Sequence, residues 1–325
     1  MVNANLPQFI HQIVLNGDRT HDHIASADLT DIQRHQTIWQ HVNLDDVDSQ
    51  HWIQNESQLD ETIINTLCAL ETRPRSLEVK NGVLVVLRGV NMNPGQDPED
   101  MVSIRVWLEK NRILSVRRRR IMAEDDIIDD LEKGEGPRSS GEFLTALVDK
   151  LADRIGDFVG RIDEKLSDTE DRLEQLAPAE LRVTLGSLRR EIAVVRRYLS
   201  PQRDALDRLN HLESKIFNDR DHQRLRDESD RVSRYLEDLD LARERAVVLQ
   251  EAFLSQIAQQ QNSRMYMLSI LSAIFLPLGF LTGLLGINVG GMPGAENANA
   301  FWIFAAMLVV MVCIQFWILR KLKWF

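Results

Sequence analysis

The feature that most constrains this chain is a pair of long uncharged segments near its C-terminus. Met267 to Gly286 is a run of 20 residues without a charged side chain, and Ala300 to Leu319 is a second run of the same length. A helix of 20 residues rises about 30 Å, which is the thickness of a bilayer's hydrocarbon core. Core helices of soluble proteins rarely stay apolar for so long, so the sequence predicts two transmembrane helices.

The residues that flank these segments predict their orientation. Aromatic residues lie near both ends of the second segment, as an interfacial belt requires, and Gln315 is its only strongly polar side chain. No Lys or Arg occurs in the connector 287–299, whereas basic residues precede the first segment and follow the second: Arg264, Arg320, Lys321 and Lys323. By the positive-inside rule, both termini are expected in the cytoplasm.

Charge divides the chain at the same place. From Met265 onward there are three basic residues and one acidic residue, Glu296, so this tail carries +2 and the preceding 264 residues carry −12 of the total of −10. Cys68 and Cys313 are the only cysteines, which leaves no disulfide framework and no thiolate zinc cluster. No cleavable signal peptide is apparent at the N-terminus. The large acidic part is therefore expected to be cytosolic.

The N-terminal part, residues 1–133, has the pattern of a small α/β domain. A helix is expected from His51 to Glu71, and Asn81-Gly82 has the composition of a two-residue hairpin turn. The predicted strands are short runs rich in Val, Ile, Leu and Trp: Phe9 to Leu15, Thr37 to Leu44, Ser76 to Lys80, Val83 to Val90, Val102 to Leu108 and Ile113 to Arg118.

Residues 134–264 are expected to form a helical stalk. A linker, Gly134 to Gly141, ends in a capping box in which Ser139 is followed by Glu142. Apolar residues then recur at steps of three and four, first from Leu144 to Leu166 and again from Leu181 to Leu199, where they make a heptad seam. The segment from about Gln223 to Ser263 contains no Pro or Gly, so it is expected to continue unbroken into the first span.

The most specific motif is Gly286-Ile287-Asn288 at the end of the first span, followed by Met292-Pro293. With two terminal spans, a basic tail, a long helix and a preceding α/β domain, the chain resembles the CorA family of divalent-cation transporters. That family has Gly-Met-Asn at this point, and its ZntB-type zinc branch has Gly-Ile-Asn. Gly294 stands where magnesium channels carry Glu, so the acidic residue nearest the mouth is Glu296.

The resemblance implies a funnel-shaped homopentamer in the bacterial inner membrane, with no cofactor and with Zn²⁺ as the transported ion. Two spans per chain cannot enclose a pore, so a pathway must in any case be shared among copies. The expected divisions after the stalk are a pore-lining helix at 265–286, a periplasmic connector at 287–299, a second helix at 300–319 and a basic tail at 320–325. The partners implied are the lipid bilayer, divalent cations and further copies of this chain.

Two readings remain for each part of the expected pathway. Asn288 either contributes an amide oxygen to a polar ring at the mouth, which the resemblance favours, or only caps the helix. One face of the helix carries mostly small residues, which either line a pore, as in the family, or let helices pack closely through Gly279-x-x-x-Gly283. The residues of this stripe are Met265, Ser269, Ser272, Leu276, Gly279, Gly283 and Gly286.

The first span contains no Asp, Glu, His or Cys, so Zn²⁺ is expected to pass substantially hydrated. The acidic soluble part is expected to concentrate cations near the entrance, although its charge is also explained by solubility. His21 and His23, with His11 nearby, are a candidate metal cluster, but a flexible polar loop is the favoured reading. Likewise, Arg117 to Arg120 fit a salt-bridged surface better than a nucleic-acid site.

The sequence gives no support for an enzyme or for ATP-driven transport, because it lacks a phosphate-binding glycine loop, a metalloprotease helix motif and a plausible catalytic triad. A magnesium or cobalt channel of the same family is one alternative function, and a non-conducting coiled-coil scaffold is another. Proton-coupled uptake, passive flux and efflux all remain open, since no membrane carboxylate or histidine marks a proton relay.

Overall fold

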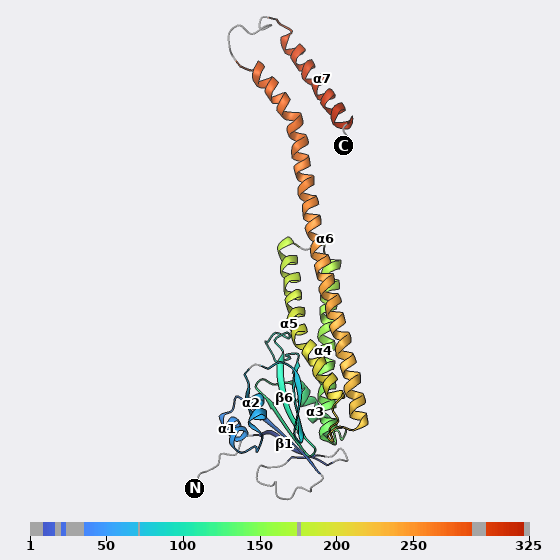
Figure 1. Ribbon diagram of the computed structural model, residues 1–325. Helices are drawn as coiled ribbons and strands as arrows, with labels where there is room; N and C mark the ends of the chain where they lie inside the picture. The colour runs from blue at the N-terminus through green and yellow to red at the C-terminus, as the bar shows by residue number, and fades with distance from the viewer. Residues whose placement is uncertain are drawn as a thin grey trace. The chain divides into compact units, whose positions relative to one another are not determined.

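The computed structural model describes residues 9–16, 21–23, 36–70, 72–173, 177–287 and 297–321. The chain divides into two compact units, Met1–Gln250 and Glu251–Phe325 (Figure 1). The first unit combines an α/β part with long helices, and the second holds two apolar helical segments. This confirms the predicted fold class, an α/β domain followed by long helices and two apolar C-terminal helices. The predicted domain boundaries stay predictions.

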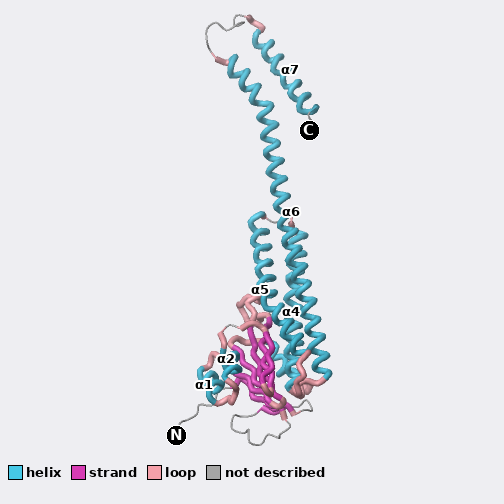
Figure 2. The backbone as a smooth tube through the Cα atoms, in the orientation of Figure 1, coloured by secondary structure: helices cyan, strands magenta, loops and turns pink. Residues whose placement is uncertain are grey.

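A seven-stranded sheet organises the α/β part (Figure 2). Its strands are β1 (Phe9–Leu15), β2 (His21–His23), β3 (Thr37–Asn43), β4 (Arg75–Val79), β5 (Gly82–Gly89), β6 (Val102–Glu109) and β7 (Arg112–Arg117). Across the sheet, neighbouring strands follow the order β2-β1-β3-β7-β6-β5-β4. Every pair is antiparallel except β3 and β7, which run parallel with Trp39 opposite Ile113.

Helices cover both faces of this sheet. On one face, Ile53 of α1 (Val47–Asn55) and Ile63 of α2 (Glu61–Cys68) join a buried cluster with Trp107 of β6. On the other face, Phe143 of α4 (Ser140–Asp171) packs on Trp39 with 4.8 Å between ring centroids. Because the strands are covered on both sides, they read as near-continuous apolar runs rather than as alternating ones.

The single helix predicted from His51 to Glu71 is wrong, because α1 and α2 are separated by a tight turn. Ser57 donates its hydroxyl to the carbonyl oxygen of Ile53 at 2.5 Å, and Gln58 follows with a φ of 61°. A left-handed residue cannot continue a right-handed helix, so the chain turns there and restarts at Glu61. The polar run around these residues was the missed turn signal.

Two further elements were not predicted. The backbone of His21–His23 pairs antiparallel with β1, Leu15 lying opposite His21, so the favoured reading of this segment as a loop is wrong.

A short helix, α3 (Met122–Glu132), follows the last strand of the sheet. Its Glu124 is fully buried, with Oε2 at 2.8 Å from an Arg117 guanidinium nitrogen and 3.1 Å from Nε2 of the equally buried His41.

The long helices follow the predicted patterns. Ser139 caps α4 by accepting the amide hydrogen of Glu142 at 3.2 Å, which confirms half of the expected capping box. The Glu142 carboxylate accepts instead from the amide of Arg138 at 2.9 Å. The apolar stripes predicted from Leu144 to Leu166 and from Leu181 to Leu199 are buried in α4 and in α5 (Pro178–Asn210).

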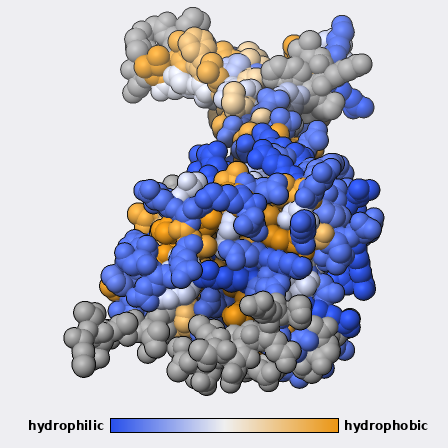
Figure 3. All heavy atoms as spheres, turned by 60° about the horizontal axis from the view of Figure 1, so that its bottom comes forward, coloured by the Kyte–Doolittle hydropathy of each residue, from blue (hydrophilic) through white to orange (hydrophobic). Residues whose placement is uncertain are grey.

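One unbroken helix, α6 (Asp219–Leu285), contains 67 residues and confirms the predicted continuous helix. Ion pairs hold its first part against α4: Arg231 contacts Asp149 and Asp153, and Arg245 contacts Asp163 at 2.5 Å. The surface of the first unit in Figure 3 is mostly hydrophilic.

The second unit contains the end of α6 and the apolar helix α7 (Ala300–Lys321). Both helices are long and apolar enough to cross a membrane. Large side chains such as Leu276, Phe280 and Trp302 are 66 to 72% exposed in the single chain. Apolar surface on this scale needs a bilayer or other protein to cover it.

Candidate ion pathway

The predicted pathway face of α6 is uncovered along its whole described length. The residues at steps of three and four on this face are all exposed: Met265, Ser269, Ser272, Leu276, Gly279, Gly283 and Gly286. A Cβ atom added at Gly279 or Gly283 would meet nothing within 4 Å. The small residues therefore serve no helix contact within the described chain, which leaves this face free for water or for other copies.

The opposite face of the same helical segment is partly covered. Ile270, Ile274 and Leu281 lie about half a turn away from the stripe, since successive helix residues are about 100° apart. The covered side chains of α7 also follow one face, from Phe304 through Leu308 to Leu319, which is only 7% exposed. The stripe is therefore the more exposed face of this part of α6.

Two neutral hydroxyl groups of the span are hydrogen-bonded to the helix itself. Ser269 donates its hydroxyl to the carbonyl oxygen of Met265 at 2.9 Å, and Thr282 donates to that of Leu278 at 3.0 Å. Their oxygen lone pairs remain able to accept hydrogen bonds from water. The helix continues through Pro277, whose missing N–H leaves one backbone carbonyl without its usual donor. Such a face suits a hydrated ion better than a bare one.

Helix α6 ends at the predicted mouth. The amide of Gly286 donates to Thr282 at 2.9 Å, and the next side chain, Ile287, is 51% exposed. Asn288 and Glu296 lie outside the described residues, so the ring of amide oxygens and the displaced acidic residue stay predictions. The chain is described again from Asn297, whose side-chain oxygen accepts the amide of Asn299 just before α7.

A row of acidic residues on α6 was missed by the sequence reasoning. Asp230, Glu237, Glu244 and Glu251 are spaced seven residues apart and are all exposed. None of them has an ion pair among the residues that the structure describes. We call these four residues the acidic row. In the sequence the same spacing leads on through Ala258 to Met265, Ser272 and Gly279, and this heptad register was the signal that could have revealed it.

The basic residues of α6 are arranged differently. Arg231 and Arg245 are committed to carboxylates of α4, with Arg245 at 3.2 Å from Glu170 in addition to Asp163. Arg231 and Arg245 therefore pair with α4, and the acidic row has no ion pair within the described part of the chain. Exposed, unpaired carboxylates raise the local concentration of cations.

The remaining candidate residues give a mixed result. Each residue of the run Arg117 to Arg120 pairs with an acid, namely Glu124, Asp45, Asp100 and Asp125, which confirms the salt-bridged reading. Within the described part of the chain, no three His, Cys, Asp or Glu side chains are arranged to hold a metal ion. The side chains of His21 and His23 lie outside that part, so a site there stays a prediction.

Comparison with known proteins gives concordant matches along the chain. The family model described as "CorA-like Mg2+ transporter protein" matches residues 34–321. A divalent cation transporter of Pseudomonas aeruginosa, CmaX, is 37% identical over 323 residues, covering 97% of this chain and 96% of that protein. The zinc transport protein ZntB of Yersinia enterocolitica is 39% identical over 290 residues, covering 89% and 88%.

Solved structures match over the same length. The full-length CmaX structure aligns with a TM-score of 0.86 at 37% identity, covering 97% of this chain and 98% of that one. The CorA magnesium transporter of Methanocaldococcus jannaschii aligns with a TM-score of 0.83, covering 97% and 99%. At 18% identity, this second likeness concerns the fold alone.

Proposed function

The chain belongs to the CorA family of divalent-cation transporters, as the sequence resemblance predicted, and we propose that it carries Zn²⁺ across the inner membrane through a pore shared by several copies. The observation that carries this proposal is the uncovered face of small residues on α6. In a monomer this face of small, partly polar residues would be exposed to lipid. In a ring of copies whose stripes face inward, it would enclose a narrow aqueous path. The family's members are ion transporters, so no enzymatic role is proposed.

Five copies are proposed from the family resemblance. In this arrangement α6 of each copy forms the inner ring and α7 the outer ring that faces lipid. The partial cover of α6 on the side opposite the stripe supports this order, because α7 then occupies the outer side. Both termini are proposed to face the cytoplasm, since basic residues flank the spans and the connector has none.

The ion is proposed to move with much of its water. The stripe offers hydroxyl oxygens and no carboxylate, imidazole or thiolate, so dehydrated Zn²⁺ would lack its usual ligands. The acidic row would supply the electrostatic attraction that the span lacks, multiplied by the number of copies. Asn288 is proposed to contact the hydration shell at the mouth through its amide oxygen.

The preference for zinc rests on likeness rather than on residue chemistry. Relatives described as zinc transport proteins are 32 to 39% identical over 290 to 322 residues, and Gly286-Ile287-Asn288 matches that branch. The family model is described by magnesium, which makes Mg²⁺ the alternative ion. A neutral path discriminates weakly among hydrated divalent ions, so Cd²⁺ and Ni²⁺ are proposed as lesser substrates.

The test is ion flux into proteoliposomes. Zn²⁺ entry, followed with a zinc-sensitive dye, should exceed Mg²⁺ entry, and acceleration by an inward proton gradient would favour symport. Gly279→Leu should block flux by filling the path, whereas Ala306→Leu, on an exposed face of α7, should not. Robust Mg²⁺ flux without a Zn²⁺ signal would overturn the zinc assignment. Absence of any flux would favour the scaffold.

A further inference from the structure

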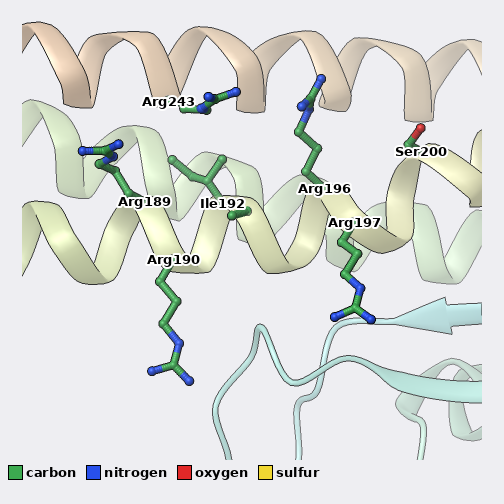
Figure 4. Close-up of a pocket in the computed structure, with 8 residues that line it drawn as sticks. Arg189, Arg190, Ile192, Arg196, Arg197, Ser200 and Arg243 are labelled. Carbon is green, nitrogen blue, oxygen red and sulfur yellow. The ribbon is translucent and has the colours of Figure 1, made fainter. Parts of the chain in front are cut away.

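A strongly basic cavity lies on the first unit between α5 and α6 (Figure 4). Its volume is about 610 Å³, and no carboxylate is among its lining residues. This local excess of positive charge is unexpected in a chain with a net charge of −10. The lining residues are Arg189, Arg190, Ile192, Ala193, Arg196, Arg197, Ser200 and Arg243, and we call this cavity the arginine groove.

The heptad pattern of α5 places these arginines. Ile192 belongs to the buried seam, and the pairs Arg189-Arg190 and Arg196-Arg197 flank it seven residues apart. In Figure 4, Arg189 and Arg196 extend from α5 toward α6, and Arg243 of α6 lies between the two helices. Arg190 and Arg197 leave the other side of α5 in the same view.

Few of these positive charges form ion pairs within the described part of the chain. Arg196 makes a bidentate salt bridge with Asp240, in which both N–O distances are 2.9 Å. Arg189 donates to the side-chain oxygen of the neutral Gln250 at 2.8 Å. Among the described residues, Arg190, Arg197 and Arg243 have no ion pair, and the Arg197 guanidinium lies 5.6 Å from the centroid of the Tyr198 ring. Within the described part of the chain, Asp240 is therefore the one carboxylate that pairs with any of the five arginines.

We propose that the arginine groove binds a soluble anion that carries two or more phosphate groups, a ligand distinct from the transported cation. Guanidinium groups donate paired hydrogen bonds that match phosphate oxygens, and they keep their charge at every physiological pH. The volume of the cavity is in the range of small-molecule sites. Since the arginines come from both α5 and α6, a diphosphate of suitable reach contacts both helices and relieves the repulsion among them.

The test uses the full-length protein in phosphatidylcholine nanodiscs and inorganic pyrophosphate as the probe. Calorimetric titration at low salt should show binding that is tighter than that of orthophosphate and that weakens as salt is added. Arg189→Gln with Arg243→Gln should weaken binding about tenfold or more, since each change removes a charged donor from the space between α5 and α6. Among the described residues neither side chain makes an ion pair, so the double variant should keep its fold.

The matched control is Arg182→Gln with Arg234→Gln. Arg182 on α5 and Arg234 on α6 are exposed and lie outside the groove, and replacing both removes two positive charges, as the double variant does. Pyrophosphate binding should be unchanged in this variant. An equal loss in both variants would mean general charge attraction and would overturn the site.

Three other outcomes would also overturn the proposal. One is the absence of pyrophosphate binding by the unmodified protein at millimolar concentration and low salt. Another is loss of pyrophosphate binding when the protein is embedded in phosphatidylglycerol nanodiscs. This loss would assign the groove to a lipid headgroup instead of a soluble ligand. The third is a double variant whose particle mass is lower than that of the unmodified protein, when the unmodified protein binds no pyrophosphate. This result would assign the groove to a contact between copies.

Discussion

Glu228→Gln should stabilise the first unit above neutral pH and change little near pH 4. Glu228 lies on α6 with its side chain only 13% exposed, and its Oε2 is buried without a hydrogen bond. The nearest cation is Arg231, at 3.5 Å from that oxygen. Arg231 is shared with Asp149 and Asp153 of α4, so three carboxylates compete for one guanidinium group.

The size of the effect follows from the pKa of Glu228. Burial raises this pKa from its ordinary 4.5 to about 7; Arg231 opposes the rise, and Asp149 and Asp153 add to it. The folded state therefore holds the proton more tightly than the unfolded state. This stabilisation is complete below pH 4.5 and is lost as pH rises through 7, at a cost approaching about 3 kcal/mol.

Glutamine resembles the protonated carboxyl group and cannot ionise, so the variant keeps the stabilisation at every pH. For a unit of this size, about 3 kcal/mol corresponds to a rise in Tm of roughly 6 to 12 °C at pH 8.5. The measurement is the Tm of full-length protein in detergent, followed by tryptophan fluorescence from pH 4.5 to 8.5. Asp238→Asn, which changes an exposed carboxylate on the same helix, is the control and should follow the unmodified protein.

The reasoning would be refuted by a difference in Tm between Glu228→Gln and the unmodified protein that does not vary with pH. It would also be refuted by a variant that is less stable than the unmodified protein at pH 8.5. That result would mean that the ionised carboxylate gains more from Arg231 than it loses by burial.

Further predictions concern the pathway, the assembly and the fold. Asn288→Ala should abolish or strongly reduce flux while the assembly persists, and Asn288→Asp should keep cation binding but alter selectivity; unchanged flux in Asn288→Ala would reduce this residue to a helix cap. Cysteine labelling at Gly291 and at an added C-terminal tag should report opposite sides of the membrane, and labelling from one side would contradict the two-span topology. Mass measurement in detergent should give five copies, and a stable monomer or dimer would defeat the shared pore. Glu124→Ala should lower the free energy of unfolding by about 3 to 5 kcal/mol, because it leaves Arg117 and the buried His41 without their shared carboxylate; urea unfolding that shows a loss below about 1 kcal/mol would refute this role.

Local patterns were sufficient for much of the architecture. The two uncharged runs, the continuous helix α6 and the buried stripes of α4 and α5 depend on the residues of one segment, and all agree with the structure. The break between α1 and α2 was missed because apolar residues recur at helical steps on both sides of the polar run at residues 54–58, where Gln58 adopts a left-handed conformation. Strand β2 escaped because three polar residues gain their structure only by pairing with β1.

The candidate pathway was predicted from the sequence as a stripe on one helix face. The motif at its mouth was the main basis of the resemblance to the CorA family. That much follows from spacing alone, because residues at steps of three and four must share a face. Spacing could not show which side of α6 is covered, that Arg117 and His41 share the buried Glu124, or that Arg243 meets the arginines of α5 in one groove. These depend on contacts between residues far apart in the chain, and burial and charge pairing arise only when the fold brings those residues together.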